Sequence, residues 1–143
     1  LVATNPGQTP GPLGKIASGG ELSRIMLALK VVLARLGTVE TLIFDEIDAG
    51  IGGAVADAVG ERLARLGRER QVLVVTHAPQ VAARARHHLR VAKTGGADDI
   101  GVEVDALDGG AREEEIARML AGAQVTAAAR AAAQSLLTSE REG

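Results

Sequence analysis

The 143-residue sequence has no cysteine, no tryptophan and no tyrosine, and it has a single phenylalanine. Without cysteine the chain has no disulfide framework, no thiolate nucleophile and no zinc site of the cysteine type. Its core must therefore be built from leucine, valine, isoleucine and alanine. At this length the chain is the size of one domain and is long enough to bury such a core.

The sequence also lacks a strong net charge and a long apolar run. The formal net charge is −2 at pH 7, so no global attraction draws the chain to nucleic acid, and any contact with DNA has to be local or lie elsewhere. No apolar run reaches the ~20 residues of a membrane span, and the start lacks the charged and then apolar layout of a signal peptide. We therefore expect a soluble, intracellular chain with no membrane partner.

The most informative stretch is a serine, two glycines and a glutamate at the predicted start of a helix. Ser18, Gly19, Gly20 and Glu21 come just before or at the beginning of a run of apolar residues at helical spacing, which are Leu22, Ile25, Met26, Leu29, Val32, Leu33 and Leu36. Glycines let an anion approach the backbone, and the free N–H groups and dipole of a helix N-terminus favour phosphate. The same residues also form a capping box, which needs no ligand. On these residues alone both interpretations stay open.

Two predicted strands end in polar residues that suit chemistry on phosphates. The apolar strand at residues 41–44 is followed by Asp45 and Glu46, and the apolar run at 71–76, typical of a parallel strand covered on both faces, is followed by His77. Open α/β sheets bind ligands at the carboxyl ends of their strands. We therefore expect Asp45 and His77 at the same edge of the sheet. Two carboxylates without a neighbouring lysine or arginine favour a functional role over a solvated acidic turn.

The order and spacing of these motifs resemble the signature and Walker B motifs of ABC-type ATPase heads, the group that includes SMC proteins and ABC transporters. Within that group, residues 15–30, 44–51 and 75–82 resemble the bacterial RecN family, and the resemblance covers nearly the whole chain. The lysine loop that grips the nucleotide is absent, because its pattern would need glycine at Thr9 and a hydroxyl at Ile16. Residues 1–143 therefore resemble the C-terminal lobe of such a head, without its N-terminal P-loop lobe and coiled coil.

The resemblance implies a role in ATP hydrolysis for each strand-end residue. Asp45 would hold Mg²⁺, through a coordinated water, beside the bound ATP. Glu46 would act as the general base that takes the proton of the attacking water. The imidazole of His77 would contact the γ-phosphate, as the switch histidine does in this group of proteins.

The resemblance also implies that the nucleotide site is shared between two heads. The signature segment would close over ATP held by the P-loop of a second head, and it comprises Ser18, Gly19, Gly20 and Glu21. Asp48 and Gly50 match the D-loop, which passes beside the opposite site and couples the two sites. The expected partners are the N-terminal P-loop lobe of the same protein, a second head in a homodimer, and DNA through the full-length protein.

The fold expected from these patterns is an α/β lobe with a largely parallel sheet, flanking helices and a small peripheral hairpin. Further helices are expected at residues 54–66, 80–85, 113–120 and 125–137, and half-exposed strands at 89–92 and 102–105. The inward face of helix 54–66 would hold Val55, Val59, Leu63 and Leu66. The last helix is so rich in alanine that we expect intrinsic propensity, with the contact between Leu136 and Leu137, to account for most of its stability.

We therefore expect the C-terminal ATPase lobe of a RecN-like protein that acts in recombinational repair of DNA double-strand breaks, in the cytoplasm at the nucleoid. The repair role follows from the resemblance alone. Two alternatives stay open, the head of another SMC-like protein or ABC-type ATPase, and a non-catalytic module that dimerises when nucleotide binds. Because the lysine loop is missing, the isolated chain is expected to hydrolyse no ATP.

Overall fold

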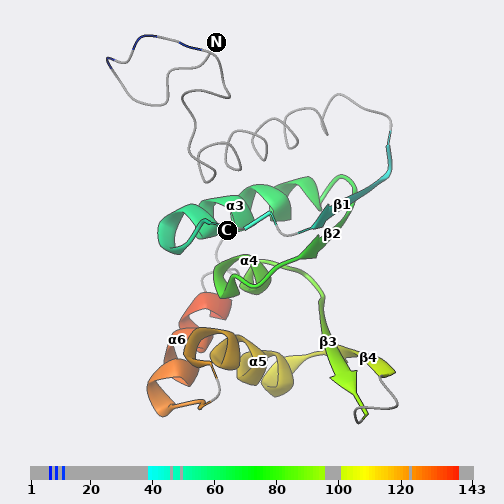
Figure 1. The fold of residues 1–143 in the computed structure, drawn as a ribbon, viewed down its shortest axis with the longest axis vertical. Coiled ribbons are helices and arrows are strands. Elements are labelled where there is room, and N and C mark those ends of the chain that lie inside the picture. The colour runs from blue at the N-terminus through cyan, green and yellow to red at the C-terminus, as the bar shows by residue number, and fades with distance from the viewer. Residues whose placement is uncertain are drawn as a thin grey trace. The chain divides into compact units, whose positions relative to one another are not determined.

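The fold is taken from a computed structural model, which describes residues 7, 9, 11, 39–45, 47–48, 50–95, 101–122 and 124–138. Two compact units make up the chain, Leu1–His77 and Ala78–Gly143. The elements follow one another along the chain as Figure 1 shows. They are β1 (Thr41–Asp45), α3 (Gly53–Leu66), β2 (Gln71–Val75), α4 (Pro79–Ala83), β3 (His88–Thr94), β4 (Gly101–Leu107), α5 (Gly109–Ala121) and α6 (Ala127–Thr138).

Several predictions concern residues outside this described part. They include the helix expected after Ser18 and the site residues Ser18, Gly19, Gly20, Glu21 and Glu46. In the part that is described, no helix is both long and apolar enough to cross a membrane.

Strands β1 and β2 form a parallel pair in the first unit, in register from Thr41 beside Gln71 to Asp45 beside Val75. The Thr41 hydroxyl donates to Gln71 Oε1 at 2.9 Å where the two strands begin. Parallel neighbours need a crossover connection, and helix α3 supplies it between the two strands. The predicted parallel pair and the intervening helix are confirmed.

Helix α3 buries a stripe of small and aliphatic residues, and this stripe differs in part from the predicted one. The buried residues are Ala56, Gly60, Leu63 and Leu66. The assignment of Val55 to the inward face was wrong, because its side chain is 46% exposed. Small residues let a helix backbone approach its neighbours closely, so Ala56 and Gly60 take the inward position in the first turns.

One face of the β1–β2 pair is covered and the other is open. Phe44 is 4% exposed, whereas Ile43, Leu73 and Val75 are 73%, 42% and 51% exposed. Along each strand, exposed residues alternate with buried or half-buried ones, because successive side chains of a strand point to opposite faces of the sheet. The expectation that β2 is covered on both faces was therefore wrong for this chain.

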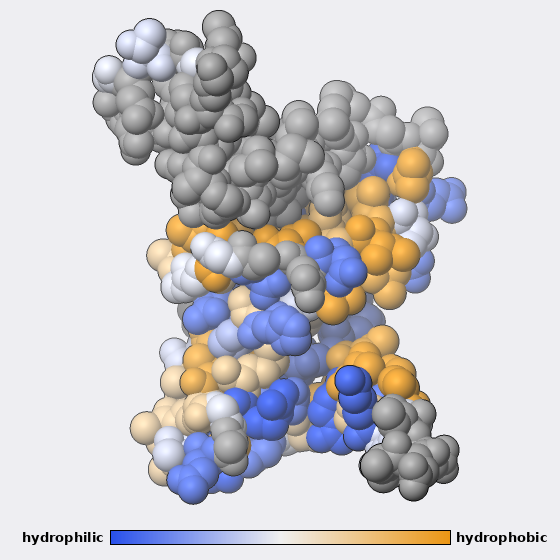
Figure 2. Space-filling view, viewed as in Figure 1, coloured by the Kyte–Doolittle hydropathy of each residue, from blue (hydrophilic) through white to orange (hydrophobic). Residues whose placement is uncertain are grey.

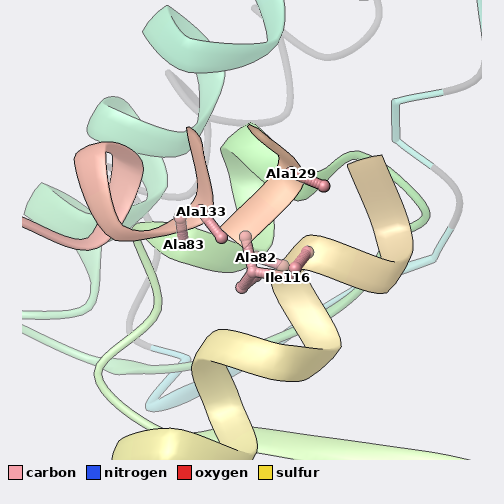
Figure 3. Close-up of a cluster of buried hydrophobic side chains, with 6 residues drawn as sticks. Ala82, Ala83, Ile116, Ala129 and Ala133 are labelled. Carbon is pink, nitrogen blue, oxygen red and sulfur yellow. The ribbon is translucent and has the colours of Figure 1, made fainter. Parts of the chain in front are cut away.

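Three helices of the second unit enclose its hydrophobic core. Figure 3 shows how α4, α5 and α6 each contribute side chains to this cluster, which consists of Ala82, Ala83, Ile116, Ala117, Ala129 and Ala133. Met119, Val125, Leu136 and Leu137 pack against it. Alanines of helix α6 thus pack closely on α5, a contact that adds to the predicted propensity and the predicted contact between Leu136 and Leu137.

Strands β3 and β4 form the predicted hairpin, antiparallel and in register from His88 beside Leu107 to Thr94 beside Gly101. On one face Arg90 Nη2 donates to Asp105 Oδ2 at 2.7 Å. The other face is apolar and exposed, and it carries Leu89, Val91, Val102 and Val104, which are 55% to 68% exposed. The hairpin thus leaves an open apolar face within this chain.

A buried carboxylate lies on α5. Glu115 is 8% exposed and accepts two hydrogen bonds from Arg118, one turn later, at 2.8 and 2.5 Å. These bonds lower the pKa of the Glu115 carboxyl below its ordinary value, against the opposing effect of burial. The folded chain therefore favours the charged form of Glu115.

Replacing Glu115 by glutamine is expected to lower the free energy of unfolding at neutral pH by about 1 kcal/mol, since one partner of this pair is solvent-exposed. Because folding lowers the pKa of Glu115, the ionised carboxylate stabilises the folded chain above the pKa that glutamate has in the unfolded chain, ~4.3. This stabilisation is lost as the pH falls through the pKa of Glu115 in the folded chain. Urea unfolding at pH 7 and at about pH 3 checks this sign, because the mutant and the wild type should converge in acid. Glu114→Gln, which breaks a pair that is half exposed on both sides, is the matched control and should change little. An equal loss for Glu115→Gln at both pH values would contradict the electrostatic origin.

Candidate functional site at the carboxyl edge of β1 and β2

The carboxyl ends of β1 and β2 bring two of the sequence-predicted residues to one edge. Asp45 is the last residue of β1 and pairs with Val75, the last residue of β2, and His77 follows two positions later. Both Asp45 and His77 are solvent-exposed. The edge predicted from the order of the motifs therefore exists, and both side chains are accessible to a ligand.

Asp48 links the loops that follow the two strands. Its side chain is 9% exposed, and its Oδ2 atom accepts the Thr76 hydroxyl at 2.6 Å and the His77 backbone N–H at 2.8 Å. The loop turns just after Asp48, because Ile51 N–H donates to the Asp48 carbonyl at 3.0 Å and Gly50 has a φ of +76°. A side chain with Cβ rarely adopts that conformation, so glycine suits position 50.

The sequence predicts Asp48 only as a D-loop residue and does not predict its bonds to Thr76 and His77. Those bonds depend on the register of two strands, which brings together residues 28 and 29 positions apart. The signals in the sequence were an aspartate three residues after one strand end and a threonine–histidine pair after the other. Nothing in either segment alone shows that they meet.

The other predicted site residues lie outside the described part of the chain. They are Ser18, Gly19, Gly20 and Glu21 of the signature segment, and Glu46 after Asp45. Their assigned roles remain predictions.

An exposed carboxylate at this edge suits Mg²⁺ that is shared with a ligand. No group of three or more histidine, aspartate or glutamate side chains in the described ranges could hold a metal ion. Mg²⁺ keeps several waters and is commonly held by one or two carboxylates together with substrate phosphates. A single exposed carboxylate such as Asp45 fits that mode of binding.

A hollow in the first unit lies at the amino ends of the two strands, away from this edge. It is lined by Val39–Thr41 and Gly67–Gln71, and the Arg70 guanidinium donates to the Val39 carbonyl there. Ligands of open α/β sheets bind at the carboxyl ends of the strands. We therefore place the candidate site at Asp45, Asp48 and His77.

The chain has close relatives in bacteria, although no family model matches it. It is 54% identical over 142 residues to the DNA repair protein RecN of Xylella fastidiosa (strain Temecula1), which covers 99% of this chain and 26% of that protein. It is 51% identical over 135 residues to RecN of Rickettsia bellii, covering 94% of this chain and 24% of that protein. RecN of Streptomyces coelicolor is 50% identical over 141 residues, and the match covers 99% of this chain and 25% of that protein.

A solved structure shares the fold. It comes from work on ATP-driven dimerization and DNA-stimulated activation of SMC ATPases, and it matches with a TM-score of 0.63 at 23% identity, over 76% of this chain and 64% of that chain. At this identity the likeness concerns the fold alone, which is an α/β fold. The chain spans about a quarter of the length of the curated relatives it matches. Over nearly its whole length, about half of the residues of this chain are identical to those of the matched quarter of these RecN proteins.

Proposed function

We propose that this chain is the C-terminal lobe of an ATPase head in a RecN protein that acts in recombinational repair of DNA double-strand breaks. The observation that carries the proposal is the common edge of β1 and β2, where Asp45, Asp48 and His77 gather. The names of the relatives and the fold shared with an SMC ATPase support the same function. In this proposal the protein works in the cytoplasm at the nucleoid.

The residues at the edge divide the work of phosphoryl transfer among them. Asp45 would hold Mg²⁺, which would supply positive charge beside the phosphates of bound ATP. Glu46 takes the proton of the attacking water as general base. The exposed imidazole of His77 donates a hydrogen bond to the γ-phosphate.

The site is completed by a second head of the same kind. The signature segment closes over ATP that the other head holds, through Ser18, Gly19, Gly20 and Glu21. The D-loop residues Asp48 and Gly50 lie beside the opposite site. Hydrolysis is then tied to closure of the homodimer, and DNA is bound by the full-length protein.

The open sheet faces support the N-terminal P-loop lobe as the missing partner. Figure 2 shows apolar residues over the β1–β2 pair and over the hairpin. Ile43 of β1 is 73% exposed, and Val91 of β3 is 68% exposed. Parallel sheets are normally covered on both faces, and an isolated two-stranded sheet is marginally stable. Three quarters of each matched RecN protein lies outside this chain, which is ample material to cover both faces.

The isolated 143-residue chain is expected to hydrolyse no ATP, because it lacks the lysine loop. Turnover should appear when the chain replaces the matched segment of Xylella fastidiosa RecN, to which it is 54% identical. We refer to this fusion as the RecN chimera. The measurement is phosphate release from ATP. It compares the chain alone, the chimera, and Xylella fastidiosa RecN that lacks the matched segment.

Two outcomes would contradict the proposal. ATP turnover by the isolated chain would show that the site needs neither a P-loop lobe nor a second head. The second outcome is a chimera that folds, binds ATP and dimerises but does not hydrolyse ATP, while authentic RecN does. That result would favour the non-catalytic dimerisation module.

A further inference from the structure

The Asp48 carboxylate joins two loops through a single oxygen atom. Oδ2 accepts hydrogen bonds from two consecutive residues, the Thr76 hydroxyl at 2.6 Å and the His77 backbone N–H at 2.8 Å. Hydrogen bonds to a charged acceptor are short and about twice as strong as neutral ones. The residue Asp48 is 9% exposed, so water competes little for these bonds.

From this geometry we propose that Asp48 is a positioning residue for His77 within its own head. The inference rests on the proposed ATPase function, and it adds to Asp48 a role separate from its place beside the opposite site. Asp48 touches no reacting atom in this proposal. It acts by holding the backbone from which the imidazole of His77 projects.

The need for such an anchor follows from where His77 lies. It is exposed and follows the last residue of β2 by two positions, so the sheet hydrogen bonds end before it. Two donors on neighbouring residues that converge on one acceptor restrain the Thr76–His77 peptide in position and in orientation. Preorganised donors are effective only when their direction is set before the charge develops.

The anchor also ties His77 to the loop after β1. Asp45 is fixed by its pairing with Val75, and three residues later Asp48 is fixed by its bonds to Thr76 and His77. The loop that carries the acidic residues and the loop that carries the histidine therefore share one hydrogen-bonded junction. Loss of the carboxylate would leave the His77 backbone N–H without this acceptor.

The RecN chimera provides the test, with Asp48→Ala, Thr76→Val, His77→Ala and the double mutant Asp48→Ala/His77→Ala. Asp48→Ala is expected to lower kcat about tenfold or more, with KM for ATP within about twofold, because misplacement of a donor affects the transition state more than binding. Thr76→Val keeps the shape and removes one donor, so it should lower kcat by less. Asp48→Asn, which retains an acceptor oxygen, should recover part of the loss.

The double mutant separates positioning from a general structural role. If Asp48 acts through His77, Asp48→Ala should cause no further loss of kcat in the His77→Ala background. An equal loss in both backgrounds, or no loss in either, would overturn the proposal. Glu61→Gln on α3, an exposed carboxylate paired with Arg65, is the charge control and should leave turnover unchanged.

A second measurement keeps the inference distinct from the proposed function. If the wild-type chimera shows no turnover, the ATPase proposal fails, and positioning is then judged in the 143-residue chain by NMR. Exchange of the His77 amide hydrogen should be faster by about tenfold in Asp48→Asn than in the wild type or in Glu61→Gln. Unchanged protection of that amide would overturn the positioning role by itself.

Discussion

Glu46→Gln is expected to stop ATP turnover by the RecN chimera while leaving its nucleotide-dependent dimer intact. Glutamine keeps the size and the hydrogen-bonding capacity of the side chain but cannot take a proton from water. A general base contributes about 100- to 10,000-fold to the rate, so kcat should fall at least about 100-fold. Phosphate release measures turnover, and analytical ultracentrifugation with and without ATP measures the dimer.

The choice of Glu46 as the base rests on its position in the sequence. In the sequence, Glu46 directly follows Asp45, the last residue of β1. Glu61→Gln makes the same chemical change on an exposed face of α3 and serves as the matched control. Wild-type turnover by Glu46→Gln would remove Glu46 from the role of base. Loss of the dimer together with turnover would point instead to a defect in folding or nucleotide binding.

The sequence predicted the first unit well where local patterns decide the structure. The strand expected at residues 41–44 with Asp45 at its end is observed as Thr41–Asp45, and the helix expected at 54–66 begins one residue earlier, at Gly53. Apolar runs bounded by turns mark strands in the sequence itself. Parallel pairing then brings their carboxyl ends together, so the shared edge of Asp45 and His77 followed from the order of the motifs.

Features that depend on packing between distant segments could not be predicted in this way. The bonds of Asp48 need the register of β1 against β2, and the burial of Ala56 in place of Val55 needs the distance between α3 and its neighbours. Helix α5 was expected from residue 113 but begins at Gly109. Two glycines in its first turn oppose helix formation by propensity, and tertiary context outweighs them.

Ile116→Ala is expected to have the largest effect on stability in the second unit. Ile116 is 0% exposed and is the one residue of the cluster larger than alanine. Figure 3 shows it between residues of α4 and α6. Truncation leaves a cavity that neighbouring methyl groups cannot fill without moving the helices, and such changes cost about 2–5 kcal/mol. Urea unfolding followed by circular dichroism measures the loss.

The matched control removes apolar atoms from the same unit without opening a cavity. Val91 lies on the open face of the hairpin with 68% of its surface exposed, so Val91→Ala should change the free energy of unfolding by no more than about 0.5 kcal/mol. The contrast tests whether the core lies between the three helices. If Ile116→Ala cost no more than Val91→Ala, the alanine contacts of α5 with α4 and α6 would have to hold the unit without it. That result would contradict the assignment of Ile116 as the centre of the core.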